Sequence, residues 1–164
     1  MADIKMVRVD ARLVHGQVAG RWFKTLSCDR VVIVEDECAK DPFMVELFQL
    51  ASPPGTDIIC YSFDQALEEW NKDQFGTGRV IVLFKYLASA SKAWHMGVKF
   101  KDLNVAQIPG GPGRRLAYAT VSLGEPEIEL LEDLVNNGVN VYIQQVPEDK
   151  QQPIMPVINK LRKK

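Results

Sequence analysis

The sequence has few histidines and cysteines and no long hydrophobic run, and each shortage excludes a class of protein. The longest apolar run near the middle, Val80 to Phe84, has five residues, whereas a membrane-spanning helix needs about 20. Asp3 and Lys5 interrupt any apolar stretch at the start, so no signal peptide is expected. The formal net charge of −1 gives no general attraction to nucleic acid or anionic membrane. We therefore expect a protein that does not itself move anything across a membrane.

The three cysteines, Cys28, Cys38 and Cys60, form no recognisable metal or redox motif. No Cys-x-x-Cys pair occurs, and neither His15 nor His95 completes a metal-ligand cluster with them. An odd number of cysteines without motif spacing is typical of a reduced cytosol. We expect buried or incidental thiols rather than redox-active ones.

Length and composition predict one globular domain. A chain of 164 residues, 46% hydrophobic and 25% charged, can bury a substantial core. No internal repeat, low-complexity linker or change in composition marks a second domain. We expect residues 1–164 to form a single domain.

Strand and helix patterns alternate along the chain. Short apolar or alternating runs predict strands over residues 4–9, 30–35, 57–61, 79–84, 101–106, 116–121 and 139–146. Amphipathic runs with capping or stop signals predict helices over residues 18–26, 42–50, 62–70, 87–96 and 125–137, and residues 151–161 are either a terminal helix or a tail. In the second of these helices, Phe43, Val45 to Leu47 and Leu50 form the expected apolar face. This order predicts an α/β three-layer sandwich, a mostly parallel sheet with helices on both faces.

The stretch from Asp10 to Val18 lies in the turn between the first strand and the first helix. His15 stands in this turn, just before the predicted helix. Ligands commonly bind at the turn after the first strand of an α/β sheet, and the N–H groups of a helix start favour an anion. Arg12 can hold a phosphate or carboxylate through two parallel hydrogen bonds.

A histidine in such a turn is a candidate phosphoryl carrier, because histidine can form a covalent phosphoryl intermediate. Transfer depends on position and on positive charge around the phosphoryl oxygens. Arg12 and the helix start supply that charge, and Gly16 permits close approach of the backbone. Asp10 could orient Arg12 or fix the tautomer of His15. Spacing alone also fits an ordinary turn histidine beside a surface arginine.

Other polar groups have two interpretations each. Asp36 and Glu37 follow the strand over residues 30–35, where they fit helix caps or partners of a nearby arginine better than Mg²⁺ ligands. Glu35 or Asp36 could instead face the His15 turn and help to hold Arg12. Lys85 ends the fourth strand and is either solvated or turned toward a phosphoryl group. His95 fits the last turn of a helix, a structural position. The loop over residues 110–115 either joins two strands or presents N–H groups and arginine to an anion or partner protein.

The motif Asp10-x-Arg12-Leu13-Val14-His15-Gly16-Gln17-Val18 resembles the phosphorylation-site signature of IIB components in the mannose–sorbose family of the bacterial phosphoenolpyruvate-dependent sugar phosphotransferase system. The resemblance extends over nearly the whole chain, through residues 31–37 with Asp41, 51–55, 103–105, 110–115 and 141–147. Many members carry Gly-Gly after the Asn-Val pair, where this chain has Ala106-Gln107.

This resemblance implies a sheet of about seven strands with one antiparallel edge, and a phosphocarrier enzyme. His15 is the implied phosphoryl acceptor from a IIA partner, and the sugar enters through membrane IIC and IID partners. Arg12 is the implied charge clamp, with Asp10 and Gln17 as orienting groups, and no metal or cofactor is required. A cytoplasmic location, peripheral to the inner face of the membrane, follows from these partners.

A second hypothesis is a non-covalent regulatory or ligand-binding α/β module, which rests on fold class alone. No Gly-x-Gly-x-x-Gly follows the first strand, which argues against nucleotide binding. A homo-oligomer is a further alternative, which exposure of Trp22 or Trp94 would support.

Overall fold

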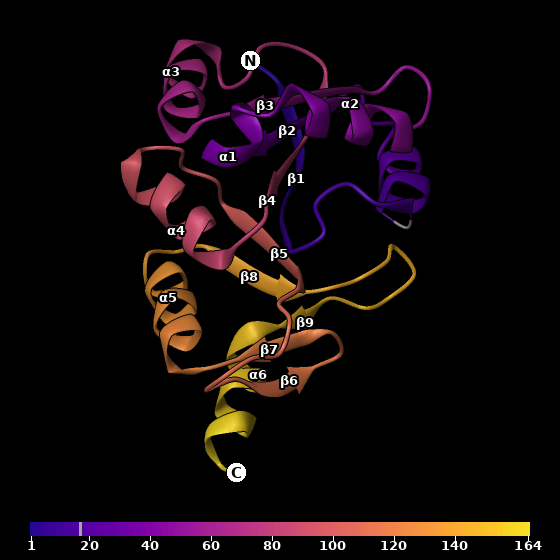
Figure 1. Ribbon diagram of the computed structural model, residues 1–164. Helices are drawn as coiled ribbons and strands as arrows, with labels where there is room; N and C mark the ends of the chain where they lie inside the picture. Colours follow the sequence, from indigo (N-terminus) through magenta and orange to yellow (C-terminus); the bar gives the residue numbers. More distant parts are fainter. Residues whose placement is uncertain (17) are drawn as a thin grey trace.

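A seven-stranded sheet with the order β3-β2-β4-β1-β5-β8-β9 forms the middle of the structure (Figure 1). The computed structural model describes residues 1–16 and 18–164. All strand pairs from β3 to β8 are parallel, and β9 pairs antiparallel with β8. The predicted mostly parallel sheet with one antiparallel edge is confirmed.

The strands are β1 (Asp3–Asp10), β2 (Arg30–Val34), β3 (Asp57–Tyr61), β4 (Arg79–Phe84), β5 (Asp102–Gln107), β6 (Arg115–Tyr118), β7 (Val121–Leu123), β8 (Asn140–Ile143) and β9 (Gln152–Pro153). The helices are the π-helical η1 (Val18–Phe23) and the α-helices α1 (Asp36–Ala39), α2 (Pro42–Ala51), α3 (Phe63–Asp73), α4 (Leu87–Met96), α5 (Glu125–Asn136) and α6 (Ile154–Arg162).

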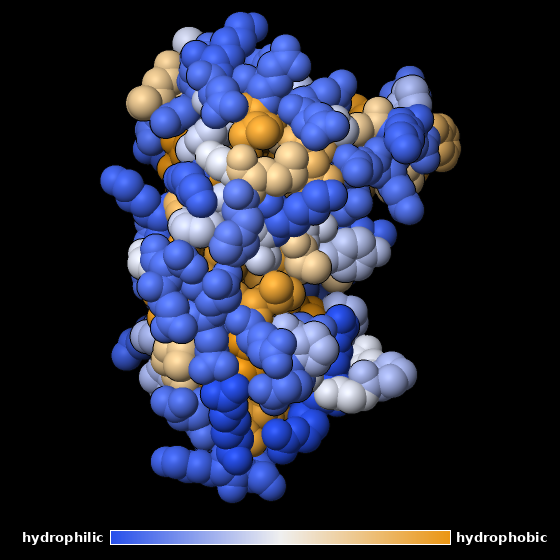
Figure 2. All heavy atoms as spheres, turned by 90° about the vertical axis from the view of Figure 1, so that its left-hand side faces the viewer, coloured by the Kyte–Doolittle hydropathy of each residue, from blue (hydrophilic) through white to orange (hydrophobic). Residues whose placement is uncertain are grey.

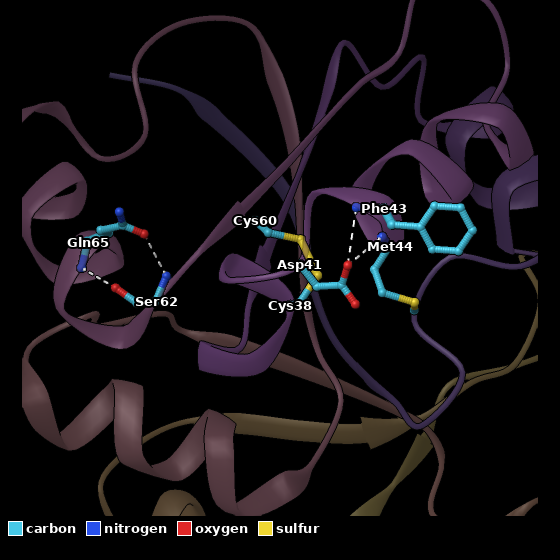
Figure 3. The surroundings of a disulfide bond; sticks show 7 residues. All are labelled: Cys38, Asp41, Phe43, Met44, Cys60, Ser62 and Gln65. Atoms are coloured by element: carbon cyan, nitrogen blue, oxygen red, sulfur yellow. Dashed lines mark hydrogen bonds between the residues drawn. A yellow bond between two sulfur atoms is a disulfide. The ribbon is translucent and has the colours of Figure 1, made fainter.

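Local sequence signals account for several of these boundaries. The Asp41 side chain accepts hydrogen bonds from the backbone N–H groups of Phe43 and Met44, and Pro42 occupies the first position of α2. Ser62 and Gln65 form a reciprocal capping box at the start of α3 (Figure 3). These caps confirm the starts predicted for both helices.

Two hydrophobic cores lie on opposite faces of the sheet. The large core joins strand residues such as Val9, Val82 and Leu103 to α3, α4, α5 and α6. The small core joins Ile33 and Leu83 to η1, α1 and α2. In Figure 1, α3, α4 and α5 lie along one side of the sheet and α2 along the other. Figure 2 views the first side, where hydrophobic atoms are visible in hollows between hydrophilic helices.

Three predicted elements differ in kind or length. The strand expected over residues 116–121 is a hairpin of β6 and β7 that forms its own two-stranded sheet. The strand expected over residues 139–146 ends at Ile143, and the chain returns through β9 before α6. The helix expected over residues 18–26 is π-helical from Val18 to Phe23. Sequence periodicity does not distinguish such local changes of winding.

The exposure of the apolar residues of α2 and of two tryptophans bears on two predictions. In the apolar face predicted for α2, Phe43, Leu47 and Leu50 are exposed, whereas Val45 packs against the small core. Phe48 is the buried residue of this helix. The π-helical segment buries Trp22, whose ring lies in the small core. Trp94 is only partly exposed and donates to the backbone of Phe100. Neither tryptophan therefore provides the exposed surface that would have supported a homo-oligomer.

Cys38 and Cys60 form a disulfide, so the expectation that all three cysteines are thiols is wrong (Figure 3). Their Cα atoms are 6.1 Å apart because β2 and β3 are neighbouring parallel strands and α1 directly follows β2. The sequence separation of 22 gives no hint of this pairing. Cys28 is a buried thiol, as predicted.

Truncation of a side chain at the middle of the sheet tests the packing of the large core. Leu103→Ala is expected to lower the free energy of unfolding by about 3 kcal/mol, because Leu103 is fully buried and leaves a cavity. Leu50→Ala, at a site 84% exposed, is the matched control and should change it by less than about 0.5 kcal/mol. Urea unfolding of both variants measures the difference, and similar losses would contradict the assignment of the core.

Candidate active site

The site begins at the carboxyl end of β1, where the strand turns polar on one face only. Val7 and Val9 point into the large core, whereas Arg8 and Asp10 lie on the opposite face. Arg8 is 3% exposed and Asp10 is fully buried. A buried ion pair needs further hydrogen bonds to offset its desolvation.

Arg8 donates such hydrogen bonds to two neighbouring segments of the chain. Its guanidinium donates to Asn104 Oδ1 at 2.8 Å, to the backbone oxygen of Gln144 at 3.2 Å and to Asp10 Oδ2 at 3.2 Å. It also lies 5.8 Å from the centre of the Trp22 ring. Burial lowers the pKa of Arg8, and the Asp10 charge partly restores it. The bonds fix β1, β5 and the end of β8 in one arrangement beneath the turn.

Asp10 connects this buried cation to the histidine turn. Its Oδ1 accepts the backbone N–H of Arg12 at 3.0 Å, and its Oδ2 lies 3.1 Å from His15 Nε2. Burial by itself raises the pKa of Asp10, but the hydrogen bonds from His15 and Arg12 and the charge of Arg8 lower it below the ordinary value. Asp10 is therefore an ionised carboxylate that orients the imidazole.

The turn holds the His15 ring with Nε2 engaged by Asp10. A carboxylate against Nε2 keeps the proton on that nitrogen, which leaves the lone pair of the neutral ring on Nδ1. The turn is tight: Leu13 N donates to Asp10 O at 2.9 Å, and Leu13 has a φ of 53°. Such a backbone is uncommon for leucine and is typical of functional turns.

A pocket of about 70 Å³ opens beside His15. Its lining comes from β1, the histidine turn, β5 and the segments after β6 and β8, through Arg8, Asp10, Arg12, His15, Val18, Ala106, Gln107, Thr120 and Gln145. A small group such as a phosphoryl group fits in a pocket of this size.

Gln145 fixes the far wall of the pocket. Its side-chain amide donates to the backbone oxygen of Ala106 at 2.6 Å and to Thr120 Oγ1 at 2.9 Å. Its own backbone oxygen accepts the indole N–H of Trp22 at 2.7 Å. One residue thus connects η1, β5 and the β6–β7 turn around the histidine.

The position of the pocket follows from the sheet topology. The pocket lies at the carboxyl ends of the neighbouring strands β1 and β5, beside the residues that follow β8. The carboxyl ends of the strands are the usual ligand site of such sheets.

Some of the predicted site residues line the His15 pocket and others do not. His15, Asp10 and Arg12 all line the pocket, with the Arg12 side chain exposed at its mouth. Gln17 lies outside the described residues. Lys85 lines a neighbouring pocket of about 190 Å³ and not the His15 pocket.

The remaining candidates contact other parts of the chain. His95 contacts Asp133 at 2.6 Å in the last turn of α4. In the loop over residues 110–115, Arg114 pairs with Glu127 at 2.9 Å and Arg115 donates to the backbone of Leu161. Both arginines are thus held by the protein itself.

The acidic residues after β2 accept hydrogen bonds from neighbouring helices. Asp36 Oδ1 accepts the backbone N–H of Phe63, at the start of α3. Glu35 Oε2 accepts a hydrogen bond from Ser89, in α4. Neither carboxylate is among the residues that line the His15 pocket.

Sequence reasoning missed Arg8, Asn104 and Gln145. Arg8 and Asn104 stand at alternate positions inside otherwise apolar strands, and a polar residue at such a position is a signal for a buried network. Gln145 follows β8 directly and carries no such signal.

No cluster of three or more His, Cys, Asp or Glu side chains that could hold a metal ion occurs among residues 1–16 and 18–164. Over the same residues, no helix is long and apolar enough to cross a membrane.

The chain is similar in sequence to components of sugar phosphotransferase systems. The family model described as "PTS system sorbose subfamily IIB component" matches residues 4–164, so the chain belongs to this family. It is 29% identical over 98% of its length to the mannose-specific EIIAB component of Escherichia coli K12. The chain spans 50% of the length of that relative.

Solved structures agree with this assignment. The crystal structure of manxB from Thermoanaerobacter tengcongensis has a TM-score of 0.89 and 33% identity, over 98% of this chain and 97% of that one. The IIBSor domain of the sorbose permease from Klebsiella pneumoniae has a TM-score of 0.85 and 27% identity, over 96% of this chain and 97% of that one. The family resemblance of the sequence is thereby confirmed.

The ion pair beneath the turn gives a pH-dependent prediction. Because the pKa of Asp10 is lower in the folded than in the unfolded chain, its ionised form stabilises the fold above the ordinary pKa of 3.8 and this stabilisation is lost as the pH falls through the folded pKa. Asp10→Asn is expected to cost about 3 kcal/mol at neutral pH, because Arg8 keeps a buried charge without its counter-charge.

Urea unfolding at about pH 7 and about pH 3 measures both effects. The native protein should lose more stability on acidification than Asp10→Asn does. An equal loss in the two proteins would mean that Asp10 is not the carboxylate responsible.

Proposed function

We propose that residues 1–164 act as the IIB phosphocarrier unit of a sugar phosphotransferase system. His15 accepts a phosphoryl group from the phosphohistidine of a IIA partner and passes it to a sugar taken up through membrane IIC and IID partners. Activity of this kind locates the protein in the cytoplasm, at the inner face of the membrane. The observation that carries the proposal is the contact of His15 Nε2 with Asp10 beside a phosphoryl-sized pocket.

The geometry supports Nδ1 as the accepting atom. The Nδ1 lone pair attacks phosphorus while the bond from phosphorus to the donor imidazole breaks, and its electron pair returns to the donor ring. The ring of His15 gains positive charge in this step. The ionised Asp10, 3.1 Å from Nε2, stabilises that charge and holds the ring in one orientation.

Arg12 is the charge clamp in this proposal. Its backbone is fixed by Asp10, while its exposed side chain stands at the mouth of the pocket. A guanidinium there can hold two phosphoryl oxygens at once. Gln17 stays a predicted orienting residue.

The other nucleophiles of the chain are poorly placed for the same chemistry. Cys28 is buried, and Cys38 and Cys60 are bonded to each other, whereas a reactive thiolate must be accessible. His95 is engaged by Asp133 and does not line the His15 pocket.

The first test is the mass of the intact protein after incubation with phosphoenolpyruvate, the two general phosphotransferase proteins and a matching IIA. One acid-labile phosphoryl group, a gain of about 80 Da, is expected on the native protein and none on His15→Ala. His95→Ala is the matched control and should gain the same mass as the native protein. No gain on folded native protein with several IIA donors would favour the non-covalent regulatory or ligand-binding module.

Arg12 is tested by the rate of the same transfer. Arg12→Ala is expected to lower the rate constant by about 100-fold, because it removes a charged donor from the transferring oxygens. Arg12→Lys should recover part of the loss, since lysine keeps the charge but not the paired geometry. Rapid-quench measurement of phosphoryl uptake gives both values, and a native rate for Arg12→Ala would exclude the clamp.

A further inference from the structure

A second pocket, of about 590 Å³, lies at the amino ends of the strands, at the opposite end of the sheet from His15. Residues 4–7 of β1, Asp102 at the start of β5 and Asn140 at the start of β8 line it, together with the end of α3. Among the described residues, none lines both this pocket and the His15 pocket. Its volume is typical of small-molecule sites in proteins. We call it the amino-end pocket.

Three lysines, Lys5, Lys99 and Lys101, line the amino-end pocket. Lys5 pairs with Asp3 at 2.7 Å, and Lys99 Nζ lies over the Trp94 ring, 3.4 Å from its centre. Within residues 1–16 and 18–164, neither Lys99 nor Lys101 has a carboxylate at ion-pair distance, and both side chains are exposed. Their charges are therefore free to bind an anion, and an ammonium group binds phosphate well.

Groups that bind hydroxyls form another part of the wall. Gln74, Asn140 and Gln151 supply side-chain amides, and Asp102 supplies a carboxylate, whose Oδ1 accepts a hydrogen bond from Asn140 Nδ2 at 2.9 Å. Amides and a carboxylate together can donate to and accept from hydroxyl groups, whereas a carboxylate repels a second anion. The amino-end pocket thus favours a ligand that is anionic at one end and hydroxylated at the other.

Aromatic side chains supply the apolar part of the lining. Trp70 and Tyr142 are half-buried and Phe100 is buried, and all three line the pocket. The C–H groups on the face of a sugar ring are apolar and pack against aromatic rings, which have an apolar body. Burial raises the pKa of Tyr142, so its hydroxyl stays neutral and can donate a hydrogen bond.

We propose that the amino-end pocket binds a small phosphorylated sugar, with the phosphate at Lys99 and Lys101 and the hydroxyl groups at Asp102 and Asn140. Inorganic phosphate would leave the amides, the carboxylate and the aromatic rings without a partner. A nucleotide would place a base, which lacks hydroxyl groups, against the amide-rich wall. The inference goes beyond the proposed phosphoryl transfer and does not depend on it, because the two pockets lie at opposite ends of the sheet.

The test is isothermal titration calorimetry of the native chain with glucose 6-phosphate as the probe. Glucose, inorganic phosphate and adenosine monophosphate are titrated separately under the same conditions. Glucose 6-phosphate should bind at least about tenfold more tightly than each of the other three, because each of them lacks one of the two groups that the pocket recognises.

Variants then locate the bound probe. Lys99→Gln and Lys101→Gln should each weaken its binding about tenfold, since each removes a charged donor to the phosphate. Asn140→Ala should weaken it about fivefold through loss of a hydrogen bond to a hydroxyl group. Lys40→Gln, at an exposed lysine after α1, is the matched control and should keep the native Kd. Thermal unfolding shows that each variant is folded.

Arg12→Ala distinguishes the two pockets and should keep the native Kd for glucose 6-phosphate. A loss of binding in Arg12→Ala, with native binding in both lysine variants, assigns the probe to the His15 pocket and overturns the proposal. No binding to the native chain, or an equal loss in Lys40→Gln, overturns it as well. Equal affinity for inorganic phosphate, or tighter binding of adenosine monophosphate, excludes the sugar phosphate as the ligand class. None of these results bears on phosphoryl uptake by His15, which the mass measurement tests separately.

Discussion

The buried contact between Arg8 and Asp10 is the interaction on which the site depends. Two opposite charges share the polar face of β1, almost without exposure to solvent. Arg8 bonds outward to β5 and to the residue after β8, and Asp10 bonds forward to the turn and to His15. Such a pair contributes little net stability, yet loss of either partner leaves a buried charge. The reactive ring is therefore held by the same bonds that align the strands beneath it.

Much of the scaffold could be predicted because its signals are local. The apolar run of β4 and the capping box at Ser62 define their elements within a few residues. The alternation of strands and helices then places the first strand's turn at the edge where ligands bind. The positions of Asp10, Arg12 and His15 together needed only this logic. The chemistry of the turn suggested their roles, the family resemblance favoured the phosphoryl-carrier interpretation over an ordinary turn histidine, and these roles remain proposals.

What could not be predicted depends on which segments become neighbours. Asn104 meets Arg8 only because β5 pairs with β1 in one register. The disulfide likewise requires β2 beside β3. The apolar face predicted for α2 is covered only in part for a related reason: a periodic pattern shows that a face exists, but not whether another element covers it. Gln145 reaches the pocket through a loop, where sequence pattern gives no orientation at all.

The short strand β9 also affects how separate molecules meet. An unpaired sheet edge offers N–H and C=O groups to any extended chain nearby and thereby favours sheet-to-sheet aggregation. Here the outermost strand on one side has two residues, and Pro153 has no N–H to donate. A foreign strand finds almost no ladder to extend there. The return of the chain through β9 thus makes this part of the sheet edge a poor template for pairing with another strand.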